Sequence, residues 1–435
     1  MGLPRINPIY NGRFVLLLLK HTLAIHIAER RVYVSLKDYL LSELKSYSEK
    51  ADQKICLSPT ENFADRGTSN PDYLDKITNL YVPEMSRGKQ DKLIFSGRTE
   101  LTNSIQLIYQ EWMQKLNAKA ITMKPLSGLH SHTLLALAFR NKFKKVLLVS
   151  ESGGGHYLTE NLFSNLGYEV MTMPVDYDNH EIDLDKTCEL LKNNNFDMIF
   201  VDQSESLNYM DFSPIFKFTD AYTIFDASHY LSNIIVGDYK NPFDMGFDLC
   251  LGTMHKNFPG PQKAFMASRE LNEQWEIITR AISMHVSSFH FADIFKAGML
   301  ISDETALKHN ARLYMENAIS LEKALKKNGI PVVERRNDQP SSYFIFLNIN
   351  DQDIAFEKYN QLLDGNIETN YRLLPYSLGY GIRIGTMPMT LRGMLPQDTE
   401  NLANIISSIY LDGATDHSSQ AIRDFLCQID KRKEI

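Results

Sequence analysis

The feature that most constrains the fold of this 435-residue chain is a series of short apolar runs without polar alternation. Segments with helical periodicity, such as 157–166 and 183–192, lie between most of these runs. Buried strands that alternate with helices are typical of a mostly parallel sheet covered on both faces, so we predict a large α/β domain. The runs are VLLVS at 146–150, MIFVD at 198–202, YTIFD at 222–226, DLCLGT at 248–253 and AFMAS at 264–268.

A different pattern follows the last of these runs. A long helical pattern extends from about 293 to 328, and strands and helices then alternate in shorter pieces. We predict an N-terminal arm and helix over 1–50, a large domain over 51–292, and a linking helix with a small α+β domain over 293–435. The other predicted strands are 331–334, 343–348 and 382–385, and the other predicted helices are 36–50, 100–116, 131–139, 400–410 and 419–429.

Composition excludes several classes of protein. The net charge is −7 and the basic residues are scattered, so we expect no nucleic-acid partner. The apolar run at 14–19 has only six residues, too few to span a membrane, and we expect no membrane association. Four widely spaced cysteines argue against a disulfide framework and favour a reducing, cytoplasmic setting.

Reactive side chains follow the ends of three predicted strands, where ligands bind in open α/β sheets. A lysine among them can form an imine with an aldehyde, and a carboxylate can keep a pyridine nitrogen protonated. Together they fit the needs of pyridoxal 5'-phosphate (PLP), with Lys256 as the amine and Asp226 as the carboxylate. The strand-end side chains are Asp202, Ser204, Asp226, His229, Thr253, His255 and Lys256.

The phosphate of such a cofactor needs hydroxyls and backbone N–H groups at the start of a helix. Ser127 and Gly128, before the predicted helix at 131–139, provide one candidate, and Ser287 and Ser288 provide a second. His156 follows three glycines that allow a close backbone approach, so its ring can stack on the cofactor.

Each of these residues also has a simpler interpretation when it is taken alone. Lys256 can be a solvated lysine, Asp226 the N-cap of the next helix, and Arg383 an exposed salt bridge at a strand edge. The histidine pairs at 130/132 and 285/290 lack the carboxylate context of a zinc motif, so no metal is expected. Only the order and spacing of the residues favour the cofactor site.

The order and spacing resemble the serine hydroxymethyltransferase family over residues 50–412. The resemblance implies PLP fold type I, with a mostly parallel seven-stranded sheet and a smaller C-terminal α+β domain. It also implies a homodimer with active sites shared between subunits. The motifs that carry it are SPTENF at 58–63, LSG at 126–128, GGHYLT at 154–159, FDASH at 225–229, GTMHK at 252–256 and GIRIGTMPMTLRGM at 381–394.

The resemblance assigns roles to individual residues. It implies that Lys256 forms the Schiff base, that Asp226 pairs with the pyridine nitrogen, and that His156 stacks on the ring. Arg383 grips the substrate carboxylate in a two-pronged contact, with Thr60 beside it. It implies that His229 and Ser204 contact the hydroxyl side of the ring, and that Thr253 and His255 line the imine. It also implies that Ser127 and Gly128 bind the phosphate, and that Tyr81, Ser287 and Ser288 contact the cofactor of the neighbouring subunit.

Some stretches of the sequence differ from the folate-dependent members of the family, and these differences indicate a more specific function. The stretches 81–87 (YVPEMSR) and 256–263 (KNFPGPQK) differ from the family pattern, and Glu84 stands near the place of a catalytic glutamate. The runs PGPQK, VDQS at 201–204 and HVSSFH at 285–290 resemble the threonine transaldolases of natural-product pathways, which do not use folate.

We therefore predict an aldol-type enzyme that breaks and forms the Cα–Cβ bond of β-hydroxy amino acids. Threonine or serine and an aldehyde are the expected substrates. Glu84, His156 and His255 are all candidates for the general base. The alternatives are a folate-dependent hydroxymethyltransferase, a threonine aldolase and, from another class, a non-catalytic protein that kept the cofactor crevice.

Overall fold

The computed structural model describes residues 36–60, 74, 76–85 and 98–434, and the apolar run at 14–19 lies outside them. The chain forms two compact units, Met1–Lys54 and Ile55–Ile435, which we describe separately. In the first unit, the predicted helix at 36–50 is confirmed as α2 (Leu36–Ala51). Within the described part of the chain, every helix is too short or too polar to span a bilayer.

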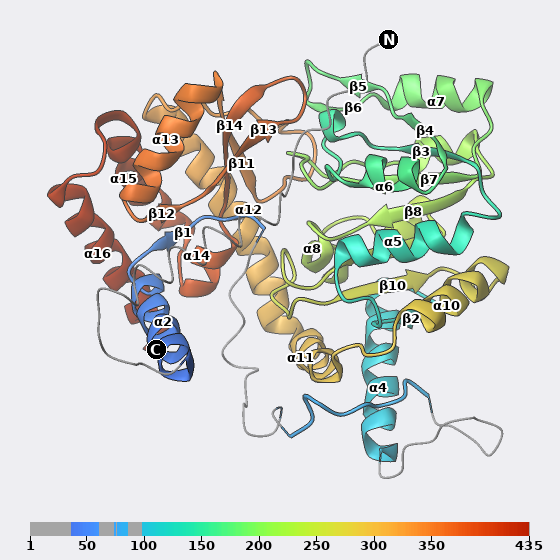
Figure 1. Ribbon diagram of the computed structural model, residues 1–435. Coiled ribbons are helices and arrows are strands. Elements are labelled where there is room, and N and C mark those ends of the chain that lie inside the picture. The colour runs from blue at the N-terminus through green and yellow to red at the C-terminus, as the bar shows by residue number, and fades with distance from the viewer. Residues whose placement is uncertain (1–35, 61–73, 75, 86–97, 435) are drawn as a thin grey trace. The chain divides into compact units, whose positions relative to one another are not determined.

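A seven-stranded sheet dominates the second unit and has the order β2-β10-β9-β8-β7-β3-β4. Strand β10 runs antiparallel to both of its neighbours, whereas the strands from β9 to β4 pair in parallel. The predicted mostly parallel seven-stranded sheet is therefore confirmed (Figure 1). The strands are β2 (Ala120–Thr122), β3 (Lys145–Leu148), β4 (Glu169–Thr172), β7 (Met198–Asp202), β8 (Tyr222–Asp226), β9 (Leu249–Thr253) and β10 (Ala264–Ser268).

The central strands were predictable because both of their faces are covered. Every residue of β7, β8, β9 and β10 is buried, so each strand is a continuous apolar run in the sequence. The two edge strands, β2 and β4, were not predicted. They have only three and four residues, and β4 is partly exposed, so neither carries a strong apolar signal.

Helices connect these strands, and the predicted ones occur within a few residues of the expected bounds. Several begin with side-chain caps, as at Ser127 and Asp183, whose side chains accept a backbone N–H of the first turn. The sequence did not predict α8 to α10. The helices are α4 (Thr99–Leu116), α5 (Gly128–Phe139), α6 (Thr159–Asn165), α7 (Leu184–Asn193), α8 (Leu231–Ile235), α9 (Pro242–Met245) and α10 (Glu273–His285).

The C-terminal part of the second unit contains a three-stranded antiparallel sheet in the order β11-β14-β13, with its own apolar core. The predicted strands at 343–348 and 382–385 are confirmed as β11 (Phe344–Asn350) and β14 (Gly379–Gly385). Strand β13 (Asn370–Leu374) was not predicted. The helices here are α13 (Gln352–Asp364), α14 (Met387–Arg392), α15 (Thr399–Asp412) and α16 (Asp416–Asp430), and β1 (Ile55–Cys56) pairs in parallel with β12 (Ile367–Glu368).

Two predictions in this part are wrong. The predicted strand at 331–334 makes only one isolated bridge, between Val332 and Leu347. The long helix predicted from 293 to 328 is two helices, α11 (Phe291–Ser302) and α12 (Glu304–Lys327). They separate at Asp303, whose side chain accepts the N–H of Ala306 at 3.0 Å and so caps the second helix. The predicted domain boundary after residue 292 stays a prediction.

A glycine turn after β3 brings His156 to the carboxyl edge of the large sheet. Gly154 has a φ of +90°, which strains any residue with a side chain. A Cβ at this position would also lie 2.5 Å from the hydroxyl of the buried Tyr376. The carbonyl of Gly154 accepts the N–H of Glu205 at 2.8 Å, so the turn is tied to the loop that follows β7.

We expect Gly154→Ala to cost about 1–2 kcal/mol more than Gly167→Ala, because only the first adds a clash to the backbone strain. Gly167 is a matched control, since its φ is +91° and a Cβ there would meet nothing within 4 Å. Urea unfolding of both variants measures the difference. If both variants lose the same free energy of unfolding, the turn at Gly154 is not tightly packed.

Candidate active site

Two aspartates end neighbouring parallel strands at the same register. Asp202 of β7 pairs with Asp226 of β8, and β9 ends beside them at Thr253. Because these strands run in the same direction, their carboxyl ends lie at one edge of the sheet. Lys256 is the third residue after the end of β9, so the predicted amine lies near the predicted carboxylate at this edge of the sheet.

The amine of Lys256 lies 3.2 Å from Nε2 of His229. Nδ1 of the same ring bonds to the hydroxyl of Tyr343, which donates its own proton to the carbonyl of Pro59 at 3.0 Å. Nδ1 must therefore carry the ring proton, which leaves Nε2 free to accept from the lysine. Burial, followed by the charge of Lys256, lowers the pKa of His229 well below its usual range, in agreement with a neutral ring.

Burial also lowers the pKa of Lys256, although the charges of Asp226 and Asp202 act in the opposite direction. A lower pKa increases the share of unprotonated amine, which is the form that attacks an aldehyde. The side chain of Lys256 is half-buried and its amine contacts the buried ring of His229, so it is not the fully solvated surface lysine of the simpler interpretation.

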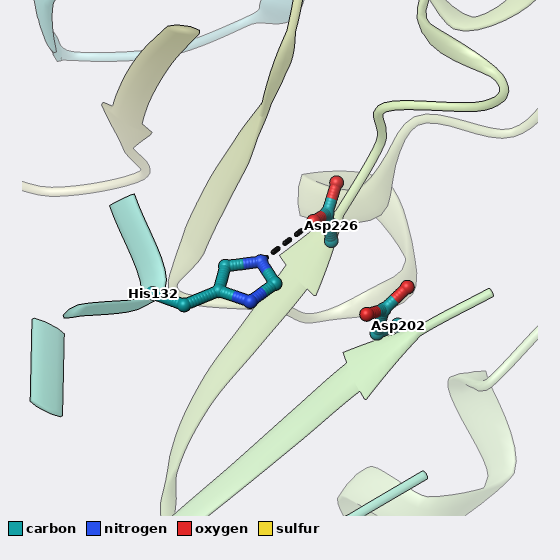
Figure 2. Close-up of side chains that lie close together, drawn as sticks. All are labelled: His132, Asp202 and Asp226. Atoms are coloured by element: carbon teal, nitrogen blue, oxygen red, sulfur yellow. Dashed lines mark hydrogen bonds and ion pairs between the residues drawn. The ribbon is translucent and has the colours of Figure 1, made fainter. Parts of the chain in front are cut away.

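Asp226 is held by His132, a residue of α5 that the sequence analysis considered only for a metal site (Figure 2). Nε2 of His132 lies 2.8 Å from Oδ2 of Asp226, and the other oxygen accepts the N–H of Ser228 at 2.8 Å. Burial raises the pKa of Asp226, but the hydrogen bond and charge of His132 outweigh it, and the pKa is lowered overall. Asp226 is thus kept ionised, as a partner for a pyridinium must be.

Asp202 positions two of the predicted cofactor contacts. Its Oδ2 accepts the backbone N–H of His156 at 3.0 Å, and its Oδ1 accepts both the N–H and the hydroxyl of Ser204. Burial and the charge of Asp226 raise the pKa of Asp202 to about 6. The sequence placed Asp202 at a strand end but gave it no role.

The N-terminus of α5 lies against the end of β9. Ser127 caps the helix by accepting the N–H of His130 at 3.2 Å, and Gly128 follows it. A Cβ on Gly128 would lie 2.7 Å from Cγ2 of Thr253, so only glycine brings the helix start this close to the strand end. The N–H groups of the first turn suit an anion such as phosphate.

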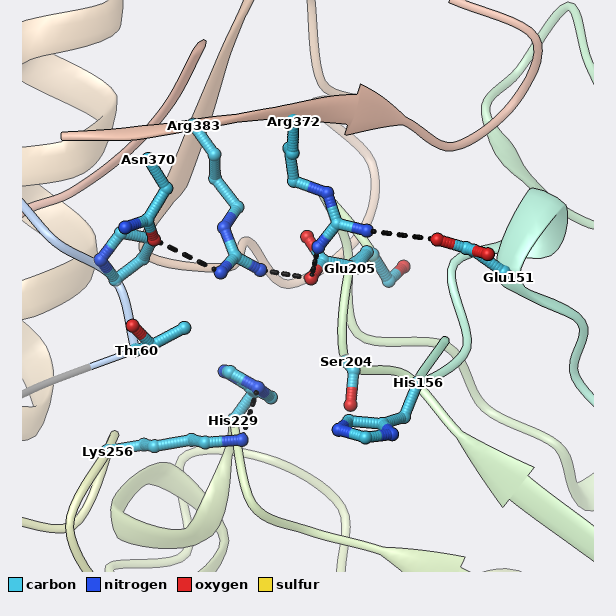
Figure 3. Close-up of polar contacts among 12 residues, drawn as sticks. Thr60, Glu151, His156, Ser204, Glu205, His229, Lys256, Asn370, Arg372 and Arg383 are labelled. Carbon is cyan, nitrogen blue, oxygen red and sulfur yellow. Dashed lines mark hydrogen bonds and ion pairs between the residues drawn. The ribbon is translucent and has the colours of Figure 1, made fainter. Parts of the chain in front are cut away.

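Arg383 lies in β14, the central strand of the small sheet, and is only 3% exposed. The alternative of an exposed salt bridge at a strand edge is therefore wrong. Its Nη1 pairs with Glu205, and its Nη2 donates to Oδ1 of Asn370 at 3.3 Å. Figure 3 shows Arg383 facing the side of the pocket that holds Lys256. A cavity of about 500 Å³ is lined by both Arg383 and Thr60.

The residues present fit PLP. Several buried polar atoms around Lys256 and Arg383 have no hydrogen-bond partner among residues 36–60, 74, 76–85 and 98–434, although buried polar groups in proteins almost always have one. These atoms are Nε2 of Gln203, Oε2 of Glu205, Oγ1 of Thr253, Nδ1 of His255 and Nε of Arg383. Together with the lysine, the carboxylate pair and the helix start, they form a polar site of the kind that binds a polar, anionic cofactor.

Comparison with known proteins agrees with this geometry. A family model described as serine hydroxymethyltransferase matches residues 36–406, which is most of the chain. The chain belongs to the serine hydroxymethyltransferase family. PLP is therefore its cofactor, and the fold is that of the family.

Two curated relatives and one solved structure are similar to this chain. The serine hydroxymethyltransferase of Pyrococcus furiosus is 23% identical over 404 residues, covering 87% of this chain and 92% of its own length. The L-threonine:uridine-5'-aldehyde transaldolase of a Streptomyces species is 26% identical over 298 residues, covering 67% of this chain and 70% of its own length.

The solved structure is that of the L-threonine transaldolase of Pseudomonas fluorescens in its internal aldimine state. It superposes with a TM-score of 0.80 at 21% identity, covering 94% of this chain and 93% of the other. At this identity the superposition shows a shared fold.

Two of the predicted site residues belong to a group around Phe289: Tyr81, which packs on its ring, and Glu84, which pairs with Lys124 beside that ring. Tyr81 packs its ring edge-on against Phe289 at 6.3 Å, and Ser287 and Ser288 are exposed immediately before it. Glu84 accepts from the hydroxyls of Tyr109 at 2.5 Å and Thr122 at 2.9 Å, and pairs with Lys124 at 3.0 Å. The role of Glu84 as a general base stays a prediction.

Lys263 belongs to the same group and was missed by the sequence analysis. Its side chain is completely buried, and its amine donates only to the carbonyl of Lys124 at 3.4 Å, with the ring of Phe289 at 5.8 Å. Burial lowers the pKa of Lys263 to about 7, against smaller opposing effects of Asp293 and Glu84. The PGPQK run was visible in the sequence, but nothing in it signals that this lysine is buried.

We expect Asp202→Asn to weaken PLP binding about tenfold at pH 7.5, because an amide cannot replace both acceptor oxygens of the carboxylate. Below pH 6 the wild-type carboxyl is itself largely protonated, so the difference between the two proteins should shrink there. Release of PLP, followed by absorbance from pH 5 to 8, measures this.

The exposed Asp178→Asn is the control and should bind PLP as the wild type does. A constant difference between Asp202→Asn and the wild type across the whole pH range would contradict the titration of Asp202.

We expect Lys263→Met to stabilise the protein at pH 7 by about 1 kcal/mol or more, since burying an ammonium is costly. The pKa of Lys263 is lowered by folding, so its favourable contribution is present above pH 10.5 and is lost as the pH falls through 7. The advantage of the variant should therefore shrink as the pH rises from 7 toward 10.

Urea unfolding at several pH values measures this trend. Lys142→Met is the control, because Lys142 is partly exposed and paired with Glu273, and its effect should show no such trend. A difference between wild type and Lys263→Met that does not change with pH would count against a buried, titrating amine.

Proposed function

We propose that this protein is a PLP-dependent threonine transaldolase. It cleaves the Cα–Cβ bond of threonine, or of serine, releases an aldehyde, and joins the glycyl unit to a second aldehyde to form a new β-hydroxy amino acid. The observation that carries the proposal is that the amine of Lys256 lies within electrostatic reach of both Asp226, which His132 holds, and Arg383.

Each of these side chains has a separate role in the proposed reaction. Arg383 binds the α-carboxylate of the amino acid and so fixes which bond of Cα stands perpendicular to the cofactor ring. Lys256 supplies the amine that holds PLP, and His229 accepts a hydrogen bond from it. Bound PLP supplies the electron sink for the carbanion, and Asp226 keeps that sink effective by stabilising a protonated ring nitrogen.

Two histidines remain as general bases within the chain. Burial lowers the pKa of His156 to about 3 and that of His255 to about 4, so both rings are neutral at physiological pH and each can accept the proton of the β-hydroxyl. Nδ1 of His255 is buried and has no protein partner. Glu84 stays a candidate only if it acts on the active site of a partner subunit.

The transaldolase activity is favoured over folate-dependent transfer by two features. A transaldolase is among the curated relatives at 26% identity. The stretches 81–87 and 256–263 also depart from the pattern of the folate enzymes. Family membership keeps a folate-dependent hydroxymethyltransferase as the second candidate, because most of the chain matches the family model.

We also propose a homodimer in the cytoplasm, with a role in natural-product biosynthesis. The group around Phe289 supports the dimer, since Tyr81, Ser287, Ser288 and Glu84 lie together and would serve the cofactor of a neighbouring subunit. The four cysteines are free, which agrees with a reducing compartment.

We expect purified protein supplied with PLP, threonine and a panel of aldehydes to release acetaldehyde and form new β-hydroxy amino acids, detected by mass spectrometry. Lys256→Ala should lose the visible absorption of the bound cofactor and lower the rate by roughly a thousandfold or more. The exposed Lys308→Ala is the control and should keep both.

Two results would reject the transaldolase proposal. Acetaldehyde without any new amino acid would indicate a simple aldolase. Glycine formation from serine that depends on added tetrahydrofolate would indicate a hydroxymethyltransferase.

A further inference from the structure

Glu205 is a buried carboxylate beside the arginine that is proposed to bind the substrate. It lies in the loop after β7, is 5% exposed, and is held there by its N–H bond to the carbonyl of Gly154. Its Oε1 pairs with the guanidinium groups of both Arg372 and Arg383 (Figure 3). Its Oε2 is buried and has no hydrogen-bond partner within the described part of the chain. A carboxylate therefore already occupies the arginine that is proposed to bind the substrate carboxylate.

The charges of this group do not balance. Two guanidinium groups share one buried carboxylate, which leaves one positive charge in surplus. The second carboxylate near Arg372, that of Glu151, lies 3.6 Å away and is half exposed, so solvent weakens its effect. Buried charge is costly when it is unpaired, so the group favours the entry of one further anion.

Arg383 is the part of the group that can receive this anion. Among the residues that the structure describes, its buried Nε has no hydrogen-bond partner and its Nη2 makes only a long bond, to Asn370 at 3.3 Å. Arg372 and Arg383 line the same cavity of about 500 Å³, together with Thr60. An incoming carboxylate at Arg383 meets the negative charge of Glu205, which competes for the same guanidinium.

Arg372 offsets this competition. It comes from β13, the strand next to β14, where it pairs with Gly381, two residues before Arg383, so the two arginines lie diagonally on the same face of the sheet. When a substrate carboxylate takes Arg383, Glu205 keeps its other arginine and is not left as an unpaired buried charge. Without Arg372, the only strong partner of Glu205 would be the substrate-binding arginine itself.

We propose that Glu205 and Arg372 together set the affinity of Arg383 for the substrate carboxylate. Glu205 holds Arg383 in place in the absence of substrate, and Arg372 retains Glu205 when the substrate binds. This inference rests on the proposed function, because it assumes that Arg383 binds the amino-acid carboxylate. Glu205 and Arg372 are specificity residues that act through Arg383.

The test is the dissociation constant of glycine for the PLP-loaded protein, measured from the change in cofactor absorbance. We expect Arg372→Gln to raise this constant about tenfold or more, because Glu205 then competes fully for Arg383. Arg372→Lys keeps the charge and should stay within about threefold of the wild type. Glu205→Gln should lower the constant, and the double variant should recover most of the affinity that Arg372→Gln loses.

Glu151→Gln is the matched control, since it removes the outer, solvent-exposed partner of Arg372 and should change the constant by less than about twofold. Melting temperatures of all the variants separate affinity from stability. If Arg372→Gln does not fold, Glu205→Gln alone tests the proposal, because the proposal requires Glu205→Gln to bind glycine more tightly than the wild type.

Any of three results would overturn the proposal: unchanged glycine binding in Arg372→Gln, weaker glycine binding in Glu205→Gln, or a double variant in which losses of glycine affinity add. Glycine binding does not require an aldehyde. Normal glycine responses without any exchange product would therefore reject the transaldolase activity alone, whereas a cofactor spectrum that does not respond to glycine in the wild type would reject both proposals.

Discussion

The carboxylates of Asp202 and Asp226 end two neighbouring parallel strands, so the hydrogen bonds of the sheet hold two acidic groups side by side where both are buried. Neither can move away without breaking the strand pairing. Each carboxylate therefore needs its own stabilising interactions to offset the free-energy cost of its burial. Asp226 receives a histidine from α5 and stays ionised, while Asp202 has a raised pKa and accepts three hydrogen bonds from the residues around it.

The rest of the pocket follows from this arrangement. The bonds to Asp202 fix the backbone of His156 and the side chain of Ser204, and Gly154 joins the same turn to the loop that carries Glu205. Glu205 in turn binds two arginines of the small sheet. One chain of polar contacts thus extends from the strand ends of the large sheet to β13 and β14, and connects the cofactor side of the pocket with the substrate side.

Much of the fold could be predicted because burial leaves a signal in the sequence. The central strands and long helices appear as apolar runs and as helical periodicity. Strands β2, β4 and β13 are edge strands, either very short or partly exposed, and carry little of this signal, and the break at Asp303 depends on one capping bond within a continuous helical pattern. For the site, the ordered motifs pointed to Lys256, Asp226, His156 and Arg383, and the structure places the other three within electrostatic reach of Lys256.

The sequence by itself determined the sheet, the family and the reactive groups, because these depend on local periodicity and on short motifs at strand ends. Only the tertiary structure decided which groups touch. His132 meets Asp226 because α5 packs on the sheet, and Arg372 lies beside Arg383 because β13 pairs with β14. Lys263 is buried beside Phe289, and Glu84 joins the same group through Lys124, for the same reason. Such contacts join residues that are tens to hundreds of positions apart, and no local pattern encodes them.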